Sequence, residues 1–246
     1  VTRWRRQDGK PLVKQLVLPF VAAVVLGVLT LFWREGEATL WTYTGVILAF
    51  WLLNMALTDI SQRVRRRSSS VWENLKKLPR SYYGMQMAHL GVAVLAVGIA
   101  MVSAFNEQRD LRMSPGESQR VGDYTFIFEG TQHVEGPNFT SDKATLRVLY
   151  KDRPYTVMYP EKRLYTARGN VMTEADLDPG LFRDLYVALG EELEGGAWAI
   201  RLQFKPYVRW LWLGGLMMMF GGFLAASDPR YRKQARRAAK QETVNA

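Results

Sequence analysis

The stretch 83-YGMQMAHLGVAVLAVGIAMVSAF-105 contains 23 consecutive residues without a formal charge. A membrane-spanning helix needs roughly 20 mostly apolar residues to cross about 30 Å of hydrocarbon. Three further stretches have the same character, namely residues 15–33, 40–58 and 207–227. The sequence therefore predicts an α-helical polytopic membrane protein with four transmembrane helices.

The polar segment 106–206 has the pattern of a β domain. In 197-AWAIRLQFK-205, apolar and other residues alternate with a period of two, which is typical of a half-buried strand. Residues 124–129, 144–150, 155–159 and 184–189 resemble further strands, and Gly, Pro, Asn and Asp separate them. We expect one all-β domain of five or six short strands, either a small sandwich or an open barrel.

The charges divide along the chain and indicate its orientation in the membrane. Basic residues cluster in segments 1–14, 61–82 and 228–246, which four spans place on one side, and the positive-inside rule makes that side cytoplasmic. Segment 106–206 carries 13 basic and 16 acidic residues and would lie on the opposite side. The net charge of +10 is therefore explained by topology and by attraction to the lipid bilayer. We expect no nucleic-acid partner.

The domain organisation follows from these patterns. We expect a cytoplasmic N-terminal segment plus a transmembrane hairpin (1–60), a cytoplasmic basic loop (61–82), a transmembrane helix (83–105), the β domain (106–206), a transmembrane helix (207–227) and a cytoplasmic basic tail (228–246). Within the loop, Trp72, Leu75 and Leu78 recur every three residues, which predicts a short amphipathic helix on the membrane surface. The chain begins without Met, so we interpret it as a fragment, or the ordered part, of a longer polytopic protein.

His89 is the main candidate for chemistry. A titratable side chain within a membrane helix is costly and usually faces a bundle interior or a cofactor. Gly84, Ala88 and Gly91 are small neighbours, and Gly84 and Ala88 form a pair that allows close helix approach. The residues alone leave three roles open: an interhelical hydrogen bond, a metal or haem ligand, and a proton relay.

The remaining polar features give no catalytic site. His133, in 130-GTQHVEGPN-138, is expected to be a solvated loop histidine, and 190-GEELEGG-196 reads as an acidic turn. The carboxylates are too scattered for a general acid and base pair. The chain has no cysteine, so it holds neither a disulfide nor a thiolate metal site. The methionine run 217–219 with its neighbouring glycines indicates helix packing.

The run 79-PRSYYGMQMAHLGVAVLAVGI-99 resembles CcmF, the membrane haem lyase subunit of bacterial cytochrome c maturation system I. Further stretches resemble the same family in the same order: 115-PGES-118, 136-GPNF-139, 160-PEKRLY-165, 172-MTEAD-176, 184-DLYVALGE-191, 198-WAIR-201 and 205-KPYVRWLWLGGLMM-218. The resemblance extends over about residues 16–232 and concerns the C-terminal third or so of the family.

This resemblance implies a component of the lyase that attaches haem covalently to apocytochrome c. It implies haem as substrate and a non-covalent haem b between the membrane helices, with His89 as one axial ligand of the haem iron. The implied partners are a haem chaperone, apocytochrome c with its thiol-presenting partner subunit, and the missing N-terminal part of the same protein. The implied location is the bacterial cell inner membrane, with residues 106–206 in the periplasm. The second axial histidine and most of the ligation centre would lie outside this chain, so whether the chain is itself enzymatic stays open.

Two rival functions remain. One is a membrane-anchored assembly scaffold that presents a protein-binding β domain without haem. The other is half of a transporter, which is disfavoured because only Asn54, Gln86 and His89 are polar residues well inside the predicted spans. In 160-PEKRLY-165, the charged residues 161–163 are expected in a solvated β turn, with contacts to haem propionates or to partner acids as the alternative.

Overall fold

The structure is a computed structural model that describes residues 9–32, 38–65, 70–167 and 169–230. The described residues form two compact units. The helical unit lies within Val1–Ala100 and Trp210–Ala246, and the sheet unit is Met101–Arg209.

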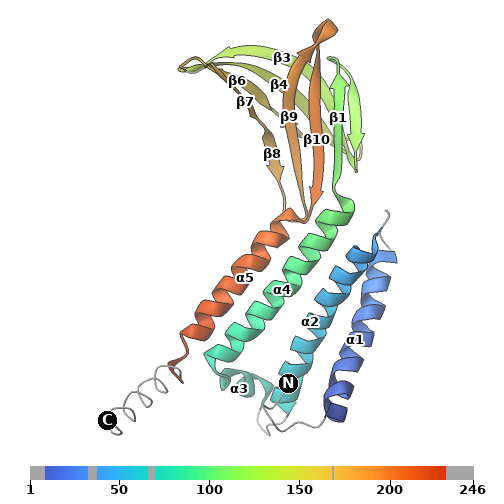
Figure 1. The fold of residues 1–246 in the computed structure, drawn as a ribbon, viewed down its shortest axis with the longest axis vertical. Coiled ribbons are helices and arrows are strands. Elements are labelled where there is room, and N and C mark those ends of the chain that lie inside the picture. The colour runs from blue at the N-terminus through green and yellow to red at the C-terminus, as the bar shows by residue number, and fades with distance from the viewer. Residues whose placement is uncertain (1–8, 33–37, 66–69, 168, 231–246) are drawn as a thin grey trace. The chain divides into compact units, whose positions relative to one another are not determined.

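The helices are α1 (Gly9–Phe32), α2 (Leu40–Arg65), α3 (Val71–Lys76), α4 (Arg80–Phe105) and α5 (Val208–Ala226), as Figure 1 shows. Among the described residues, three helical segments are long and apolar enough to cross a membrane, namely Leu40–Val64, Arg80–Phe105 and Val208–Ala226. In α1 the corresponding apolar stretch is the shorter segment Leu16–Thr30. The membrane class of the prediction is therefore supported, while the count of four spans stays a prediction.

Three helices are longer than the hydropathy predicted: α1 begins at Gly9 instead of residue 15, and α2 and α4 are extended by polar residues. α2 continues past residue 58 to Arg65, and Asp59 and Arg63 extend it with an ion pair between successive turns, with 3.0 Å from Nε to Oδ2. α4 begins at Arg80 because the carbonyl of Pro79 accepts hydrogen bonds from the backbone N–H groups of Tyr82 and Tyr83. The added residues of α2 and α4 include polar ones, and a hydropathy criterion ends a predicted span where such residues begin.

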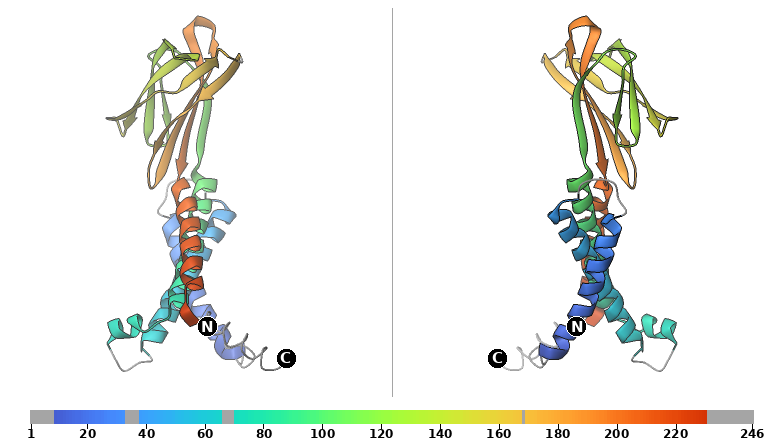
Figure 2. Two further views of the ribbon diagram at one scale, coloured as in Figure 1. Left: turned by 90° about the vertical axis from the view of Figure 1, so that its left-hand side faces the viewer. Right: turned by 90° about the vertical axis from the view of Figure 1, so that its right-hand side faces the viewer.

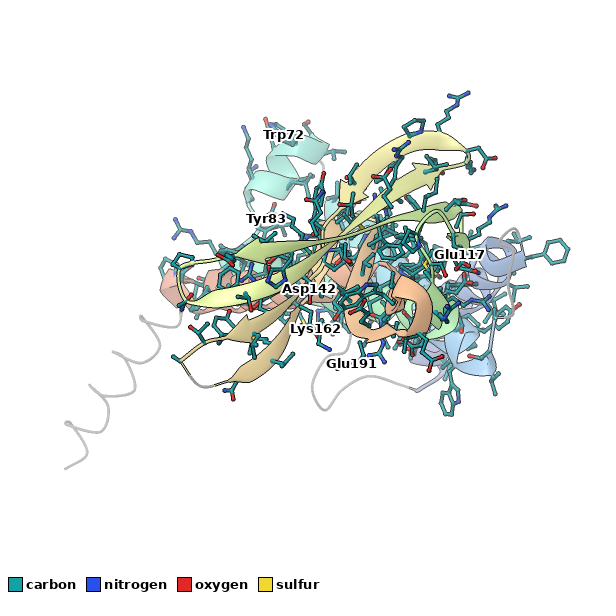
Figure 3. The ribbon with its side chains drawn as sticks, turned by 90° about the horizontal axis from the view of Figure 1, so that it is seen from above. Trp72, Tyr83, Glu117, Asp142, Lys162 and Glu191 are labelled. Atoms are coloured by element: carbon teal, nitrogen blue, oxygen red, sulfur yellow. The ribbon has the colours of Figure 1, made fainter. Side chains whose placement is uncertain are left out.

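The predicted short helix of the basic loop is present as α3. Trp72 is exposed, whereas Asn74 is buried and donates its amide hydrogen to the carbonyl of Val64, 3.2 Å away. The hydroxyl of Tyr83 donates to the carbonyl of Leu75 at 2.6 Å, so α3 is tied to both α2 and α4. Figure 3 labels Trp72 of α3 and Tyr83 of α4.

Glycines bring α4 and α5 into close contact. A Cβ atom added at Gly84 would lie 2.4 Å from the carbonyl oxygen of Gly221, and one added at Gly91 would lie 2.7 Å from that of Gly214. The two contacts are seven residues apart on each helix, which is two helical turns. Gly214 and Gly221 therefore serve helix packing, as predicted for this glycine-rich helix, whereas a Cβ atom added at Gly215 or Gly222 would meet no described atom within 4 Å.

The sheet unit contains ten strands in its described residues: β1 (Glu107–Met113), β2 (Ser118–Val121), β3 (Tyr124–Glu135), β4 (Phe139–Tyr150), β5 (Arg153–Met158), β6 (Glu161–Tyr165), β7 (Asn170–Glu174), β8 (Asp176–Pro179), β9 (Arg183–Leu193) and β10 (Ala197–Pro206). They form two antiparallel sheets. One sheet has the order β1-β10-β9-β8, and the other has the order β2-β3-β4-β6-β7 with β5 also paired to β4.

One hydrophobic core lies between the two sheets. Phe126 and Phe128 of β3 and Leu146 of β4 come from one sheet, and Leu189 of β9 and Leu202 of β10 come from the other. All five are fully buried. Figure 2 shows the two layers of strands facing each other. The sandwich is thus the form that the predicted all-β domain takes.

The β domain has more strands than the sequence predicts, and three polar segments differ from their predicted structure. Five or six strands were expected, but β1, β2, β6, β7 and β8 add to the predicted set because strands with charged or exposed residues lack the alternation used to find them. His133 lies in β3 opposite Asp142, so the expected loop is wrong. Residues 161–163 lie in strand β6 and in no turn, and the acidic turn shrinks to Glu194–Gly196 because β9 continues to Leu193.

Candidate functional site

A cavity of about 360 Å³ lies in the helical unit and has His89 in its wall. Its apolar lining includes Trp51, Leu52 and Met55 of α2, and Leu16 of α1 also contributes. Its polar lining comes from α2 and α4. His89 is exposed in the described chain, so the cavity is open to the surface of the unit.

The imidazole of His89 is held in one orientation by its own helix. Its Nδ1 atom lies 2.7 Å from the carbonyl oxygen of Met85, one turn earlier in α4. A carbonyl oxygen only accepts hydrogen bonds, so Nδ1 carries the hydrogen and Nε2 of the neutral ring keeps its lone pair. This tautomer is the one in which Nε2 can bind a metal ion, with a backbone carbonyl as the orienting partner.

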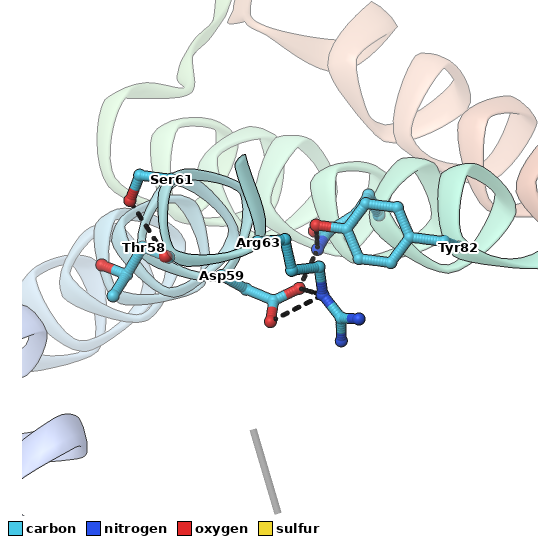
Figure 4. Close-up of polar contacts among 6 residues, drawn as sticks. Thr58, Asp59, Ser61, Arg63 and Tyr82 are labelled. Carbon is cyan, nitrogen blue, oxygen red and sulfur yellow. Dashed lines mark hydrogen bonds and ion pairs between the residues drawn. The ribbon is translucent and has the colours of Figure 1, made fainter. Parts of the chain in front are cut away.

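Four polar side chains form a connected cluster at the same cavity, which we call the Asp59 cluster: Asp59, Arg63, Tyr82 and Gln86. Nε of Arg63 donates to both carboxylate oxygens of Asp59, at 3.1 and 3.0 Å. The amide of Gln86 donates to Oδ2 of Asp59 at 3.0 Å and to the hydroxyl of Tyr82 at 3.1 Å. The guanidinium carbon of Arg63 lies 4.6 Å from the centre of the Tyr82 ring. Figure 4 shows the ion pair between Asp59 and Arg63 of α2, with Tyr82 of α4 beside it.

His89 stands out in the sequence, whereas most of the Asp59 cluster does not. In the sequence, Gln86 is recognisable only as a polar residue within a span, and Arg63 falls in the predicted cytoplasmic loop. The available signal was a helical one, since Asp59 and Arg63 are four residues apart, as are Tyr82 and Gln86. Their convergence depends on the packing of α2 against α4, which hydropathy does not give.

The cavity also contains an unsatisfied buried donor. Nε1 of Trp51 is buried and has no hydrogen-bond partner among the described residues. The cavity thus combines a free imidazole nitrogen, an orphaned indole N–H, apolar walls and a guanidinium. This set fits one face of a haem, which needs a neutral imidazole for its iron, apolar surface for its ring and polar groups for its carboxylates.

Many titratable groups of the sheet unit form ion pairs. Nδ1 of His133 lies 3.0 Å from Oδ1 of Asp142 across β3 and β4, and both side chains are exposed. Lys162 pairs with Glu191, and Figure 3 shows these two residues near Asp142. In the described part of the chain, no group of three or more His, Cys, Asp and Glu residues is placed to hold a metal ion. His133 is therefore a paired surface residue in this structure.

Comparison with known proteins identifies relatives of both units. Residues 104–206 match the family described as the CcmF C-terminal beta-sandwich. A cytochrome c-type biogenesis protein CcmF from Pseudomonas fluorescens is 45% identical over 241 residues, which are 98% of this chain and 36% of that protein. The protein of the same name from Escherichia coli strain K12 is 42% identical over 244 residues, which are 99% of this chain and 36% of that protein.

A solved structure shares the fold. The structure of a protein named Cytochrome c Heme Lyase CcmF superposes with a TM-score of 0.68 over 91% of this chain and 36% of that chain, at 18% sequence identity. Helices and sandwich thus occur together in a related protein. The predicted resemblance to CcmF is therefore confirmed over nearly the whole chain, which spans 36% of the length of these curated relatives.

Proposed function

We propose that the chain is part of a haem lyase that attaches haem covalently to apocytochrome c, and that His89 is an axial ligand of a haem b bound in its membrane helices. The hydrogen bond from Nδ1 of His89 to the carbonyl of Met85 carries this proposal, because it leaves Nε2 free for iron. The names of the CcmF relatives support the role in cytochrome c biogenesis, and the name of the protein with the related structure supports the lyase.

Haem b, when bound, would supply one-electron transfer that keeps the iron of the incoming substrate haem ferrous. The residues of this chain have separate tasks around it. His89 would hold the iron through Nε2, and the Met85 carbonyl fixes the orientation of the imidazole ring. Trp51, Leu52 and Met55 provide apolar surface that excludes water from the ring. The second axial ligand would come from the part of the lyase that this chain does not span.

The sheet unit is proposed to lie in the periplasm and the basic segments in the cytoplasm, in a multi-pass protein of the bacterial inner membrane. The charge distribution along the chain supports this orientation. The proposed partners of the sheet unit are the haem chaperone and apocytochrome c with its thiol-presenting subunit. Deleting residues 106–206 should abolish co-purification of these partners, and intact co-purification would contradict this assignment.

A visible spectrum of the complex purified in detergent tests the haem proposal. The chain is co-expressed with the portion of the lyase that it does not span, and oxidised and dithionite-reduced spectra are compared for wild type, His89→Ala and His133→Ala. His133 is a matched control, because it is the other histidine of the chain and lies in the sheet unit. We expect sharp reduced b-type bands in wild type and His133→Ala and their loss in His89→Ala. Bands that persist unchanged in His89→Ala, or are absent from wild type, would favour the scaffold without haem.

A further inference from the structure

The guanidinium of Arg63 is only partly used by its contacts. Nε binds the carboxylate of Asp59. The two terminal nitrogens, Nη1 and Nη2, have no hydrogen bond to any residue that the structure describes, and the side chain is 46% exposed. Arginine binds carboxylates best through a pair of parallel N–H donors. Arg63 therefore presents an unused donor edge at the cavity that contains His89.

The Asp59 cluster holds this donor edge in place. Asp59 is only 13% exposed and accepts hydrogen bonds from both Arg63 and Gln86. The Tyr82 ring supports the guanidinium from α4. Two helices thus fix a side chain that would otherwise have many rotamers, which lowers the entropic cost of binding an anion.

The spacing of the cluster suits a haem whose iron binds His89. Tyr82, which lies under Arg63, precedes His89 by seven residues, or about 10 Å along α4 at 1.5 Å per residue. That length is comparable with the distance from the iron of a haem to its propionate carboxylates. The apolar residues Trp51 and Leu52 lie about three turns before Arg63 in α2. The cavity is therefore apolar at one end and cationic at the other.

We propose that Arg63 binds a propionate carboxylate of haem b, and that Asp59, Gln86 and Tyr82 are positioning residues for its guanidinium. This inference rests on the proposed haem-binding function and adds the group that recognises the polar edge of the ring. Asp59 offsets one positive charge, but residues 65–67 that follow Arg63 are all arginines, so the net charge of this sequence segment stays positive. An anionic carboxylate is therefore attracted to the end of α2.

The test compares haem with haem dimethyl ester, which has the same ring and iron but no carboxylates. Each is titrated into the haem-free complex in detergent, and binding is followed by the His89-dependent absorption bands. We expect wild type to bind haem on the order of ten-fold more tightly than the ester, as for one charge-assisted hydrogen bond. Arg63→Gln should bind both alike while keeping the same bands, because the iron ligand is untouched.

Two variants control for charge and for folding. Arg80→Gln removes the same charge from an exposed residue at the start of α4 and should keep the wild-type preference for haem. Arg63→Lys keeps a charge without the paired donors and should show a reduced preference. If Arg63→Gln does not assemble, the Arg63→Lys titration decides the question.

The possible results distinguish the role of Arg63 from the proposal that His89 binds haem iron, on which it rests. An equal preference for haem in wild type and in both Arg63 variants would overturn the role of Arg63 while leaving His89 as ligand. Loss of bound phospholipid from Arg63→Gln without a change in haem preference would assign Arg63 to a lipid phosphate and likewise overturn it. A wild-type complex without His89-dependent bands would overturn both proposals.

Discussion

The contact between α4 and α5 predicts opposite effects for two adjacent glycines of α5. A Cβ atom at Gly214 would lie 2.6 Å from the carbonyl oxygen of Gly91, about 0.8 Å inside the 3.4 Å at which ordinary contact begins. The obstructing atom is backbone, so Gly214→Ala must push the helices apart, and overpacking of this kind costs about 1–3 kcal/mol. At Gly215 an added Cβ meets no described atom within 4 Å. Gly215→Ala should therefore stabilise by up to about 1 kcal/mol through helix propensity.

The two substitutions add the same methyl group one residue apart in the same helix, so each is the control for the other. The assay is thermal unfolding of the complex in detergent, followed by helical circular dichroism. The difference of about 1–4 kcal/mol in the free energy of unfolding corresponds to roughly 2–16 °C in Tm, at about 2–4 °C per kcal/mol for a domain of 150–250 residues. Gly221 and Gly222 repeat the pair two turns later, with the contact again at the first glycine. Equal Tm values for both members of a pair would refute the close packing of these helices.

Two further substitutions test the ends of the helices and the sandwich. The backbone N–H of Arg230 and then that of Ser81 donate to the Asp228 carboxylate and lower its pKa from the ordinary 3.8 to about 2. Since the folded-state pKa is depressed, the ionised Asp228 carboxylate stabilises the folded state above about pH 4. The difference in unfolding free energy between wild type and Asp228→Asn should therefore be constant at pH 5–7. It should shrink as the pH falls towards 2. In the sandwich, Nε of Arg183 donates to the hydroxyl of Tyr124 at 2.8 Å. Arg183→Met should cost about 2–3 kcal/mol in chemical denaturation because the bonds to a charged donor are lost, and a cost below 0.5 kcal/mol would contradict this role.

The sequence predicts those helices and strands in which the pattern of apolar residues reflects which side chains are buried. The spans appear in hydropathy, and strands such as β3 and β10 appear through alternation, with Phe126 and Phe128 pointing into the core. β1 could not be found in this way because its sequence, EQRDLRM, carries charges on both faces. Its pairing with β10 includes Asp110 and Arg201, which are 91 residues apart in the chain. A single sequence does not encode such a distant partner in any local pattern.

The residues of the candidate site likewise fall into those that the sequence predicts and those that it does not. His89 can be found from sequence because one titratable residue in an apolar stretch is conspicuous by itself. Arg63 and Asp59 cannot, because their charges lie just beyond the apolar stretch 40–58, and Arg63 falls in the predicted basic loop 61–82. Their role depends on Gln86 and Tyr82, which α4 brings against the end of α2. A site that is shared by two helices becomes visible only when their packing is known.

α4 separates its two tasks onto two faces, and this separation can be tested. Gly84 and Gly91 contact α5, whereas Gln86 and His89 line the cavity with α2. Gly214→Ala should therefore displace α5 without adding atoms to the cavity, so the Tm falls while the reduced b-type bands keep their wavelength and intensity below the unfolding transition. The same spectra recorded against temperature provide the measurement. Loss of the bands well below the Tm of the variant would show that the glycine contact also holds the haem cavity in shape, and the two faces of α4 would then have to be treated as one site.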